Sequence, residues 1–158
     1  KASPVPIILK ETGCGFSNNT LQRLSNMGVA AIDVSGLGGT HWGRIEGHRA
    51  GENTYLQQTA ETFRNWGIDT VQSVRNAAVF SEQVEVWGSG GVRHGLDAAK
   101  LFALGATTVG FAKPMLEAAM KTADAVTQTM QTIEYELRVA LFCTGSRDLH
   151  ELKEKVRC

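Results

Sequence analysis

The sequence has no excess of charge of either sign, because 16 Lys and Arg residues balance 16 Asp and Glu residues. Proteins that bind nucleic acid or an anionic membrane surface generally carry a positive field, so neither partner is expected. Long apolar runs are also missing, and none approaches the roughly 18 residues that a membrane-spanning helix requires. The composition therefore predicts a globular domain that binds neither nucleic acid nor a membrane.

Cysteine is scarce, and its placement excludes two kinds of stabilisation. Cys14, Cys143 and Cys158 are odd in number, far apart and in no CxxC spacing, so a disulfide framework or a zinc site is not expected. We interpret them as core or surface thiols in a reducing, cytoplasmic setting. The sequence also lacks HExxH, GxSxG and Walker P-loop motifs.

Apolar, β-branched runs alternate with amphipathic stretches along the whole chain. The pattern predicts strands at residues 5–11, 29–34, 84–88 and 107–111. It predicts helices at residues 20–27, 54–66, 70–80 and 96–104, then one long helix or two over 114–143 and a charged helical tail after 145. Residues 36–52 are expected to form a long polar loop, and the first strand is expected to be buried. Strands separated by helices pair in parallel.

Four strands, each followed by helix, amount to half of a (β/α)8 barrel or to a small open doubly wound sheet. Four strands do not close a barrel by themselves, so the barrel interpretation requires a second half that this chain lacks. Residues 1–158 show no linker-like change of composition, and we treat them as a single piece. Exposed barrel edges favour a homo-oligomer or a partner half.

Many of the 17 glycines fall where the predicted strands end. Gly90 and Gly91 come directly after the third strand, and Val92 and Arg93 lead into the next helix. Ala112 and Lys113 stand at the corresponding point after the fourth strand. Backbone N–H groups of glycine turns and helix N-termini bind phosphate, and (β/α)8 barrels place phosphate in this position. Tight turns capped by glycine are the alternative explanation.

Three side chains are candidates for contacts to the rest of such a ligand. Lys10 ends an apolar strand, so its ammonium is expected to point into the barrel mouth, although a surface lysine is the alternative. Ser35 and Thr40 bring hydroxyls to a glycine-rich loop that suits a polar ring edge or a phosphate. Asp33 is expected to have a structural role. The polar residues after Thr40 are expected to form a solvated loop face, with contact to a diphosphate as the alternative (His41, Arg44, Glu46, His48 and Arg49).

These motifs resemble the type 2 isopentenyl-diphosphate isomerases, which are flavin-dependent (β/α)8 barrels. The resemblance covers residues 6–17, 28–34, 38–42, 66–68, 89–93, 97–100 and 141–145. Residues 90–106 also resemble 2-hydroxy-acid oxidases and inosinate dehydrogenases, whereas residues 10–17, 39–42 and 143–145 are particular to the isomerases. One departure is Asp69, where the family usually has proline at the start of a helix.

The resemblance implies that this chain is the C-terminal half of the barrel and holds FMN. Its contacts would come from Lys10, Ser35, Thr40, Gly90, Gly91, Val92, Arg93, Ala112 and Lys113. The family uses reduced FMN as an acid/base group to interconvert isopentenyl and dimethylallyl diphosphate, with Mg2+ on the substrate and NADPH as the reductant.

The family's catalytic glutamine and its Mg2+-binding glutamate belong to the absent N-terminal half. No catalytic residue or metal ligand is therefore nominated in these 158 residues, and the isolated chain is expected to be inactive. Two other functions remain open at this point. One is an FMN-dependent oxidoreductase of the oxidase or inosinate dehydrogenase type, and the other is a noncatalytic half-barrel that binds phosphate.

Overall fold

A computed structural model of the chain describes residues 3–155, so Cys158 lies outside the described residues. One parallel sheet has the order β1-β2-β3-β4. Its strands are β1 (Ile8–Lys10), β2 (Ala31–Asp33), β3 (Glu85–Gly88) and β4 (Thr108–Val109). The register aligns Lys10 with Asp33, Asp33 with Trp87, and Trp87 with Thr108. Since strand side chains alternate between faces, these four residues form one row on one face.

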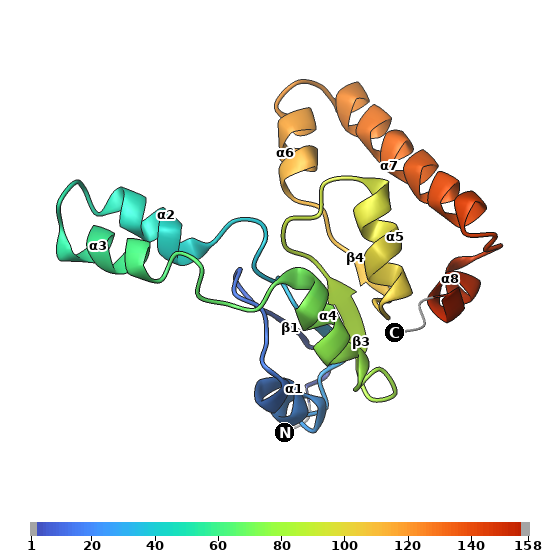
Figure 1. Cartoon of the computed structure of the whole chain (residues 1–158), viewed down its shortest axis with the longest axis horizontal. Coiled ribbons are helices and arrows are strands. Elements are labelled where there is room, and N and C mark those ends of the chain that lie inside the picture. The colour runs from blue at the N-terminus through green and yellow to red at the C-terminus, as the bar shows by residue number, and fades with distance from the viewer. Residues whose placement is uncertain (1–2, 156–158) are drawn as a thin grey trace.

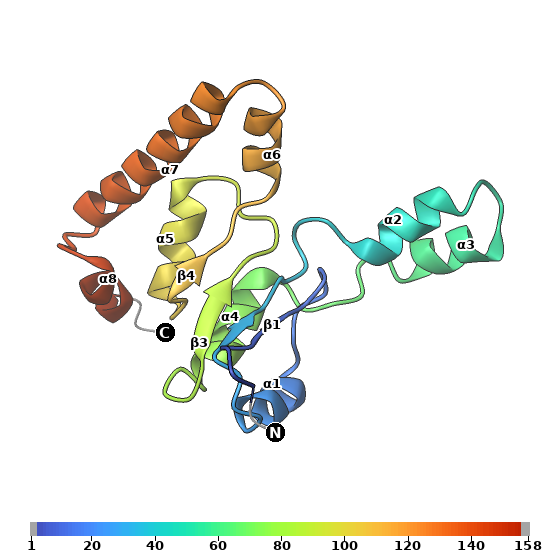
Figure 2. The same cartoon turned by 180° about the vertical axis from the view of Figure 1, so that it is seen from behind.

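The helices are α1 (Asn18–Ser25), α2 (Trp42–Arg49), α3 (Tyr55–Thr62), α4 (Thr70–Ala78), α5 (Gly95–Ala103), α6 (Lys113–Ala119), α7 (Ala123–Cys143) and α8 (Leu149–Lys155). Helices α1, α4 and α5 lie against the sheet, and α7 and α8 lie outside α5 (Figure 1). The hairpin of α2 and α3 stands away from the sheet (Figures 1 and 2). Among residues 3–155, no helix combines the length and apolar character needed to cross a bilayer.

The core lies between the sheet and the helices that cover it. Ile32 and Val86 point to this side from the two central strands, and both are fully buried. They pack in one cluster with Leu21 of α1, Val74 of α4 and Leu101 of α5. Burying one such side chain contributes about 1.5–3 kcal/mol. A smaller cluster links α5 to the outer helices. In it, Ala99 and Ala103 of α5 pack with Ala140 of α7 and Leu152 of α8.

Local signals explain several helix starts. Ser17 caps α1 by accepting a hydrogen bond from the N–H of Thr20 at 3.2 Å, as its position before the helix predicts. Asp69 caps α4 by accepting from the N–H of Gln72 at 2.8 Å. The replacement of the family's proline by aspartate at this position is therefore compatible with the helix start.

Three expectations from the sequence were wrong. The first strand is short, and Val5, Ile7 and Ile8 are exposed rather than buried. Val5 and Ile7 precede β1, which is an edge strand, and no helix among residues 3–155 covers the sheet face that carries Ile8 (Figure 2). The loop predicted over residues 36–52 contains α2. The expected solvated face is wrong for His41, which is 8% exposed and caps α2, whereas Glu46, His48 and Arg49 are exposed as expected.

Other predictions were confirmed with shifted boundaries. The predicted helices at 54–66 and 70–80 are α3 and α4, which are both shorter. The stretch at 114–143 forms two helices, α6 and α7, and the charged tail forms α8. Short strands are sufficient here because each is hydrogen-bonded to its neighbours in register and loops continue the pairing, as when Val34 donates to Trp87 at 2.9 Å.

Candidate functional site

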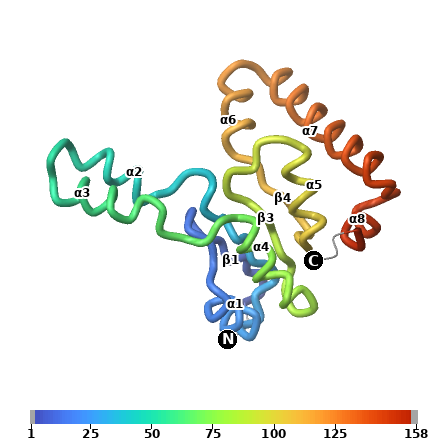
Figure 3. The backbone as a smooth tube through the Cα atoms, viewed as in Figure 1, coloured from blue at the N-terminus to red at the C-terminus, as the bar shows by residue number. Residues whose placement is uncertain are grey.

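The carboxyl ends of the four strands surround one hollow of about 950 Å³. Parallel strands deliver their following loops to the same edge of the sheet. Figure 3 traces two such loops, which rise from β3 toward α5 and from β4 toward α6 on the same side of the sheet. All nine residues predicted to contact the flavin line this hollow: Lys10, Ser35, Thr40, Gly90, Gly91, Val92, Arg93, Ala112 and Lys113.

Lys10 is held at the hollow by two hydrogen bonds. Its Nζ donates to Ser35 Oγ at 2.8 Å and to the carbonyl oxygen of Glu11 at 2.8 Å. An ammonium group has three donors, and the third finds no acceptor among residues 3–155. The Glu11 carboxylate is turned to the backbone, where it accepts from the N–H groups of Gly13 and Cys14. A cation with a free donor therefore faces the space that a ligand would fill.

Ser35 has an unusual backbone for a residue other than glycine, with φ at +34°. Ser35 as a whole is 7% exposed. The carboxylate of Asp33 holds this turn, because Oδ1 accepts from the N–H of Ser35 at 3.2 Å. The same Oδ1 accepts from the hydroxyl of Ser89 at 2.6 Å, which ties the end of β2 to the end of β3. The predicted structural role of Asp33 is thus a link between two strand ends.

Two glycine-rich loops pack backbone to backbone at this edge. Gly90 and Gly91 have φ values of +104° and +77°. A Cβ on Gly90 would lie 2.3 Å from the carbonyl oxygen of Gly36, and one on Gly91 would lie 2.3 Å from that of Gly38. Glycine is therefore required here by loop–loop contact as well as by φ. No hydrogen bond from the N–H groups of Gly90, Gly91 or Val92 to a protein atom is found among residues 3–155, so these donors are available to an anion.

The loop after β4 brings the start of α6 to the same hollow. Ala112 is the N-cap of α6, and no side chain in the described part of the chain accepts a hydrogen bond there. The first-turn N–H groups consequently have no capping acceptor of the usual kind. The ammonium of Lys113 is 3.6 Å from Glu117 and largely exposed. A phosphate group would suit this donor set, with N–H donors from two loops and an exposed cation beside them.

Cys14 and His41 form a pair beside the hollow. Cys14 Sγ lies 3.3 Å from His41 Nε2, and His41 Nδ1 accepts from the N–H of Arg44 at 3.3 Å. Burial raises the pKa of the Cys14 thiol, and the negative charge of Glu11 raises it further. A raised pKa disfavours the thiolate form of Cys14. His41 anchors the start of α2 next to Thr40.

Several lining residues were not nominated from the sequence. They are Thr12, Asp33, Gly38, Gly39, Trp42, Ser89, Gly110, Phe111, Pro114 and Glu117. Most follow a strand end, so their position in the chain could have suggested them. Trp42 could not have been found in this way, because it reaches the hollow only through the unforeseen helix α2. Among residues 3–155, no group of three or more His, Cys, Asp or Glu side chains is arranged to hold a metal ion.

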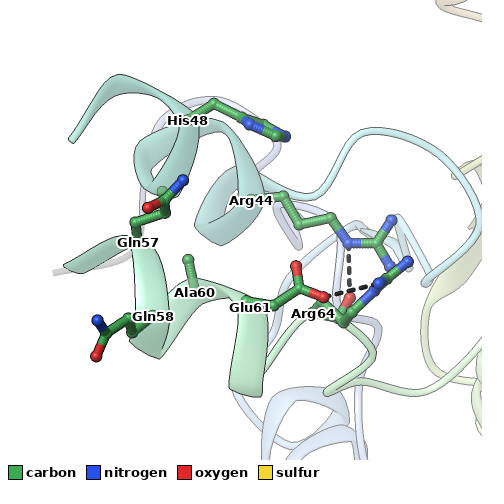
Figure 4. A pocket seen from close by; sticks show the side chains of 8 residues that line it. Arg44, His48, Gln57, Gln58, Ala60, Glu61 and Arg64 are labelled. Atoms are coloured by element: carbon green, nitrogen blue, oxygen red, sulfur yellow. Dashed lines mark hydrogen bonds and ion pairs between the residues drawn. The ribbon is translucent and has the colours of Figure 1, made fainter. Parts of the chain in front are cut away.

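A second hollow of about 580 Å³ lies between α2 and α3 (Figure 4). Both of its arginines are already engaged with protein groups. Arg44 donates to the carbonyl oxygen of Arg64 at 2.7 Å and to Asn65 at 2.8 Å. Arg64 is paired with Glu61 at 2.7 Å. This lining offers no converging backbone donors comparable to those at the strand ends, so the first hollow is the better candidate site.

The site and the fold together define a class: a parallel α/β half-barrel with a glycine-lined hollow at its strand ends. The sequence profile of the FMN-dependent dehydrogenases matches residues 1–157. This chain therefore belongs to the FMN-dependent dehydrogenase family.

Within this family, the chain is similar to named isopentenyl-diphosphate delta-isomerases. The isopentenyl-diphosphate delta-isomerase of Legionella pneumophila (strain Corby) is 71% identical over 150 residues, which cover 95% of this chain and 44% of the relative. That of Bdellovibrio bacteriovorus is 54% identical over 155 residues, covering 98% of this chain and 45% of the relative. The resemblance found in the motifs is thereby confirmed. The chain spans less than half the length of these relatives.

Solved structures show the same fold at low sequence identity. A flavocytochrome b2 mutant with benzoylformate has a TM-score of 0.71 at 19% identity, covering 98% of this chain and 35% of that one. Mandelate oxidase has a TM-score of 0.70 at 22% identity, covering 96% of this chain and 37% of that one. The predicted α/β architecture with about four βα units, half of a (β/α)8 barrel, is confirmed.

Proposed function

We propose that this chain is the C-terminal, FMN-binding half of a type 2 isopentenyl-diphosphate isomerase. The reaction interconverts isopentenyl diphosphate and dimethylallyl diphosphate. The observation that carries the proposal is that all nine predicted contact residues line one hollow, in a chain 71% identical to a named isomerase. Residues 1–158 act as a single piece in this proposal.

The donor set of the hollow fits FMN at both ends. The N–H groups of Gly90, Gly91 and Val92, with the start of α6, would hold the phosphate. Lys10 would place its positive charge, and Ser35 and Thr40 their hydroxyls, along the polar edge of the ring. Reduced FMN supplies the acid/base chemistry when it is bound. The contribution of Lys10 is electrostatic, because a nearby cation stabilises an anionic ring edge.

The other parts of the proposal follow from the family. Mg2+ would bind the substrate diphosphate, and NADPH would reduce the flavin. The acid/base side chains and the metal ligands would come from parts of the barrel outside residues 1–158, so residues 1–158 alone would be inactive. We further propose a cytoplasmic enzyme that assembles as a homo-oligomer. The uncovered sheet face at Ile8, which is 47% exposed, supports burial against another part of a complete enzyme.

A second candidate is an FMN-dependent oxidoreductase, favoured by the family name and by the fold shared with mandelate oxidase. The two candidates differ in their use of electrons. An oxidoreductase consumes an electron acceptor in proportion to product, whereas an isomerase does not. Identity of 71% to an isomerase, against 22% to the oxidase, makes the isomerase the stronger proposal. A noncatalytic phosphate-binding half-barrel is the third candidate.

Titration of the purified chain with FMN, followed by flavin fluorescence, tests the binding site, with riboflavin as the control. Tight binding of FMN but not of riboflavin supports a phosphate site at Gly90, Gly91 and α6. Equal or absent binding would contradict it. The activity is tested by replacing the matched region of the Legionella pneumophila enzyme with this chain. The chimera should isomerise isopentenyl diphosphate without a stoichiometric electron acceptor, and an inactive but folded, FMN-loaded chimera would count against the isomerase.

A further inference from the structure

Asp33 ends β2 at the candidate site, and its carboxylate makes an uneven set of contacts. Both of its hydrogen bonds arrive at Oδ1, one from the N–H of Ser35 and one from the hydroxyl of Ser89. Lys10 is its neighbour in the same row of the sheet. Even so, no salt bridge joins Asp33 to a cation among residues 3–155, because Lys10 turns to Ser35 and Glu11 instead.

The bond from the N–H of Ser35 explains how Ser35 keeps its backbone conformation. A residue with a side chain is disfavoured at a φ of +34°, and such residues need support from their surroundings. An aspartate that accepts from the N–H two residues later forms an Asx turn, which supplies that support. Ser89 fixes the carboxylate from the other side at 2.6 Å. Ser35 is thus held in place by Asp33.

Ser35 in turn determines where the Lys10 ammonium lies. Its hydroxyl is one of only two acceptors for Lys10 Nζ among residues 3–155, and the other is a backbone carbonyl. We propose that Asp33 is a positioning residue that holds the Lys10 ammonium at the hollow through the Ser35 turn. The consequence for the cofactor rests on the function proposed above, but the placement of Lys10 can be tested without it.

Because both hydrogen bonds reach the same oxygen of Asp33, two substitutions can distinguish a positioning role from an effect of its charge. Asp33→Asn keeps an Oδ1 acceptor for both serines and removes the negative charge, whereas Asp33→Ala removes both. If Asp33 positions Lys10 through Ser35, the asparagine variant behaves as the wild type and the alanine variant does not. If the charge of Asp33 were what held Lys10, both variants would change to the same extent.

The test is competitive acetylation of the purified chain without flavin, with each lysine quantified by mass spectrometry. Exposed Lys121 is the internal reference. Loss of one hydrogen bond that restrains Lys10 should raise its relative rate about two- to tenfold in Asp33→Ala. The rate should stay at the wild-type value in Asp33→Asn. An unchanged rate in the alanine variant, or an equal rise in both variants, would overturn the proposal.

Two further variants test the route through Ser35. Ser35→Ala should raise the Lys10 rate on its own, and the double variant with Asp33→Ala should add little to it, because contacts in one chain of hydrogen bonds are not additive. Additive rises would contradict the route. Asp69→Ala is the matched control, since Asp69 also accepts a backbone N–H but lies at the start of α4. Asp69→Ala should leave the acetylation rate of Lys10 unchanged. If Asp69→Ala raised that rate as much as Asp33→Ala does, the effect of Asp33→Ala would be explained by general destabilisation of the fold, and the proposal would fail.

FMN affinity is a separate arm of the experiment. If the wild-type chain binds FMN, Asp33→Ala should weaken binding of the reduced, anionic form more than that of the oxidised form, and Asp33→Asn should not. If the wild-type chain binds no FMN while the acetylation rates change as expected, the proposed cofactor function fails and the placement of Lys10 by Asp33 stands. The two proposals therefore fail in different measurements.

Discussion

Gly90 lies where the loops after β2 and β3 touch, and replacing it with alanine should disturb both the fold and the site. A Cβ at this position would lie 2.3 Å from the carbonyl oxygen and 2.6 Å from the nitrogen of Gly36. Both atoms belong to backbone, which does not move aside as a flexible side chain does. The φ of +104° adds a second penalty for any residue with a Cβ.

The magnitude can be judged against Gly28, which also has a positive φ, +73°, but has no atom of residues 3–155 within 4 Å of the position that a Cβ would take. Gly28→Ala should carry only the penalty for φ, about 1 kcal/mol. Gly90→Ala carries a similar penalty plus the overlap with Gly36, which adds about 1–3 kcal/mol. For a chain of this size, 1 kcal/mol shifts Tm by about 2–4 °C, so Gly90→Ala should lower Tm by roughly twice as much as Gly28→Ala or more.

Calorimetry and FMN titration on both variants check this reasoning. Gly90→Ala should also weaken FMN binding, by tenfold or more if two phosphate contacts are displaced at about 1 kcal/mol each, whereas Gly28→Ala should bind FMN as the wild type does. Equal Tm losses in the two variants would refute the argument from loop contact. Unchanged FMN affinity in Gly90→Ala would refute the phosphate site even if Tm fell as expected.

Two further predictions concern the core and the Cys14 thiol. Leu21→Ala should lower the free energy of unfolding by about 2–5 kcal/mol, because Leu21 is fully buried in the main cluster; urea denaturation measures this, and a loss below about 1 kcal/mol would contradict its placement. Glu11→Gln should make Cys14 react faster with a thiol reagent at about pH 8, since removing the charge that raises the pKa of Cys14 increases its thiolate fraction. A rate that is unchanged or lower in stopped-flow labelling would show that Glu11 does not act on Cys14.

The order of strands and helices could be predicted because each signal is local. Apolar runs, caps such as Ser17, and glycines at helix ends each act over a few residues. The same local reasoning failed at α2, whose sequence contains Gly43 and Gly47 and shows little apolar periodicity. Gly47 is explained only by the fold, because a Cβ there would lie 2.3 Å from the Cβ of Ala60 on α3. A contact between helices thus overrides a weak helix propensity.

The candidate residues could be predicted for a related reason, since the C-terminal end of a parallel strand is where such folds place a ligand. The hydrogen bonds between these residues could not be predicted. The bond between Ser89 and Asp33 joins residues 56 positions apart, and it depends on the register that aligns β2 with β3. The positive φ of Ser35 could not be predicted from the sequence either, because serine, unlike glycine, does not indicate a positive φ.

The two ends of the hollow differ in how they are supported, and this difference bears on function. The end at Gly90 and Gly91 is enclosed by contacts with the loop after β2, with Thr70 donating to the carbonyl oxygen of Gly90 at 2.6 Å. The end at Lys10 lies on the edge strand, beside a sheet face that no helix among residues 3–155 covers. A preorganised site loses less entropy when its ligand binds. The chain by itself should therefore recognise the phosphate of FMN more strongly than the ring, which is why the comparison of FMN with riboflavin is more informative than activity alone.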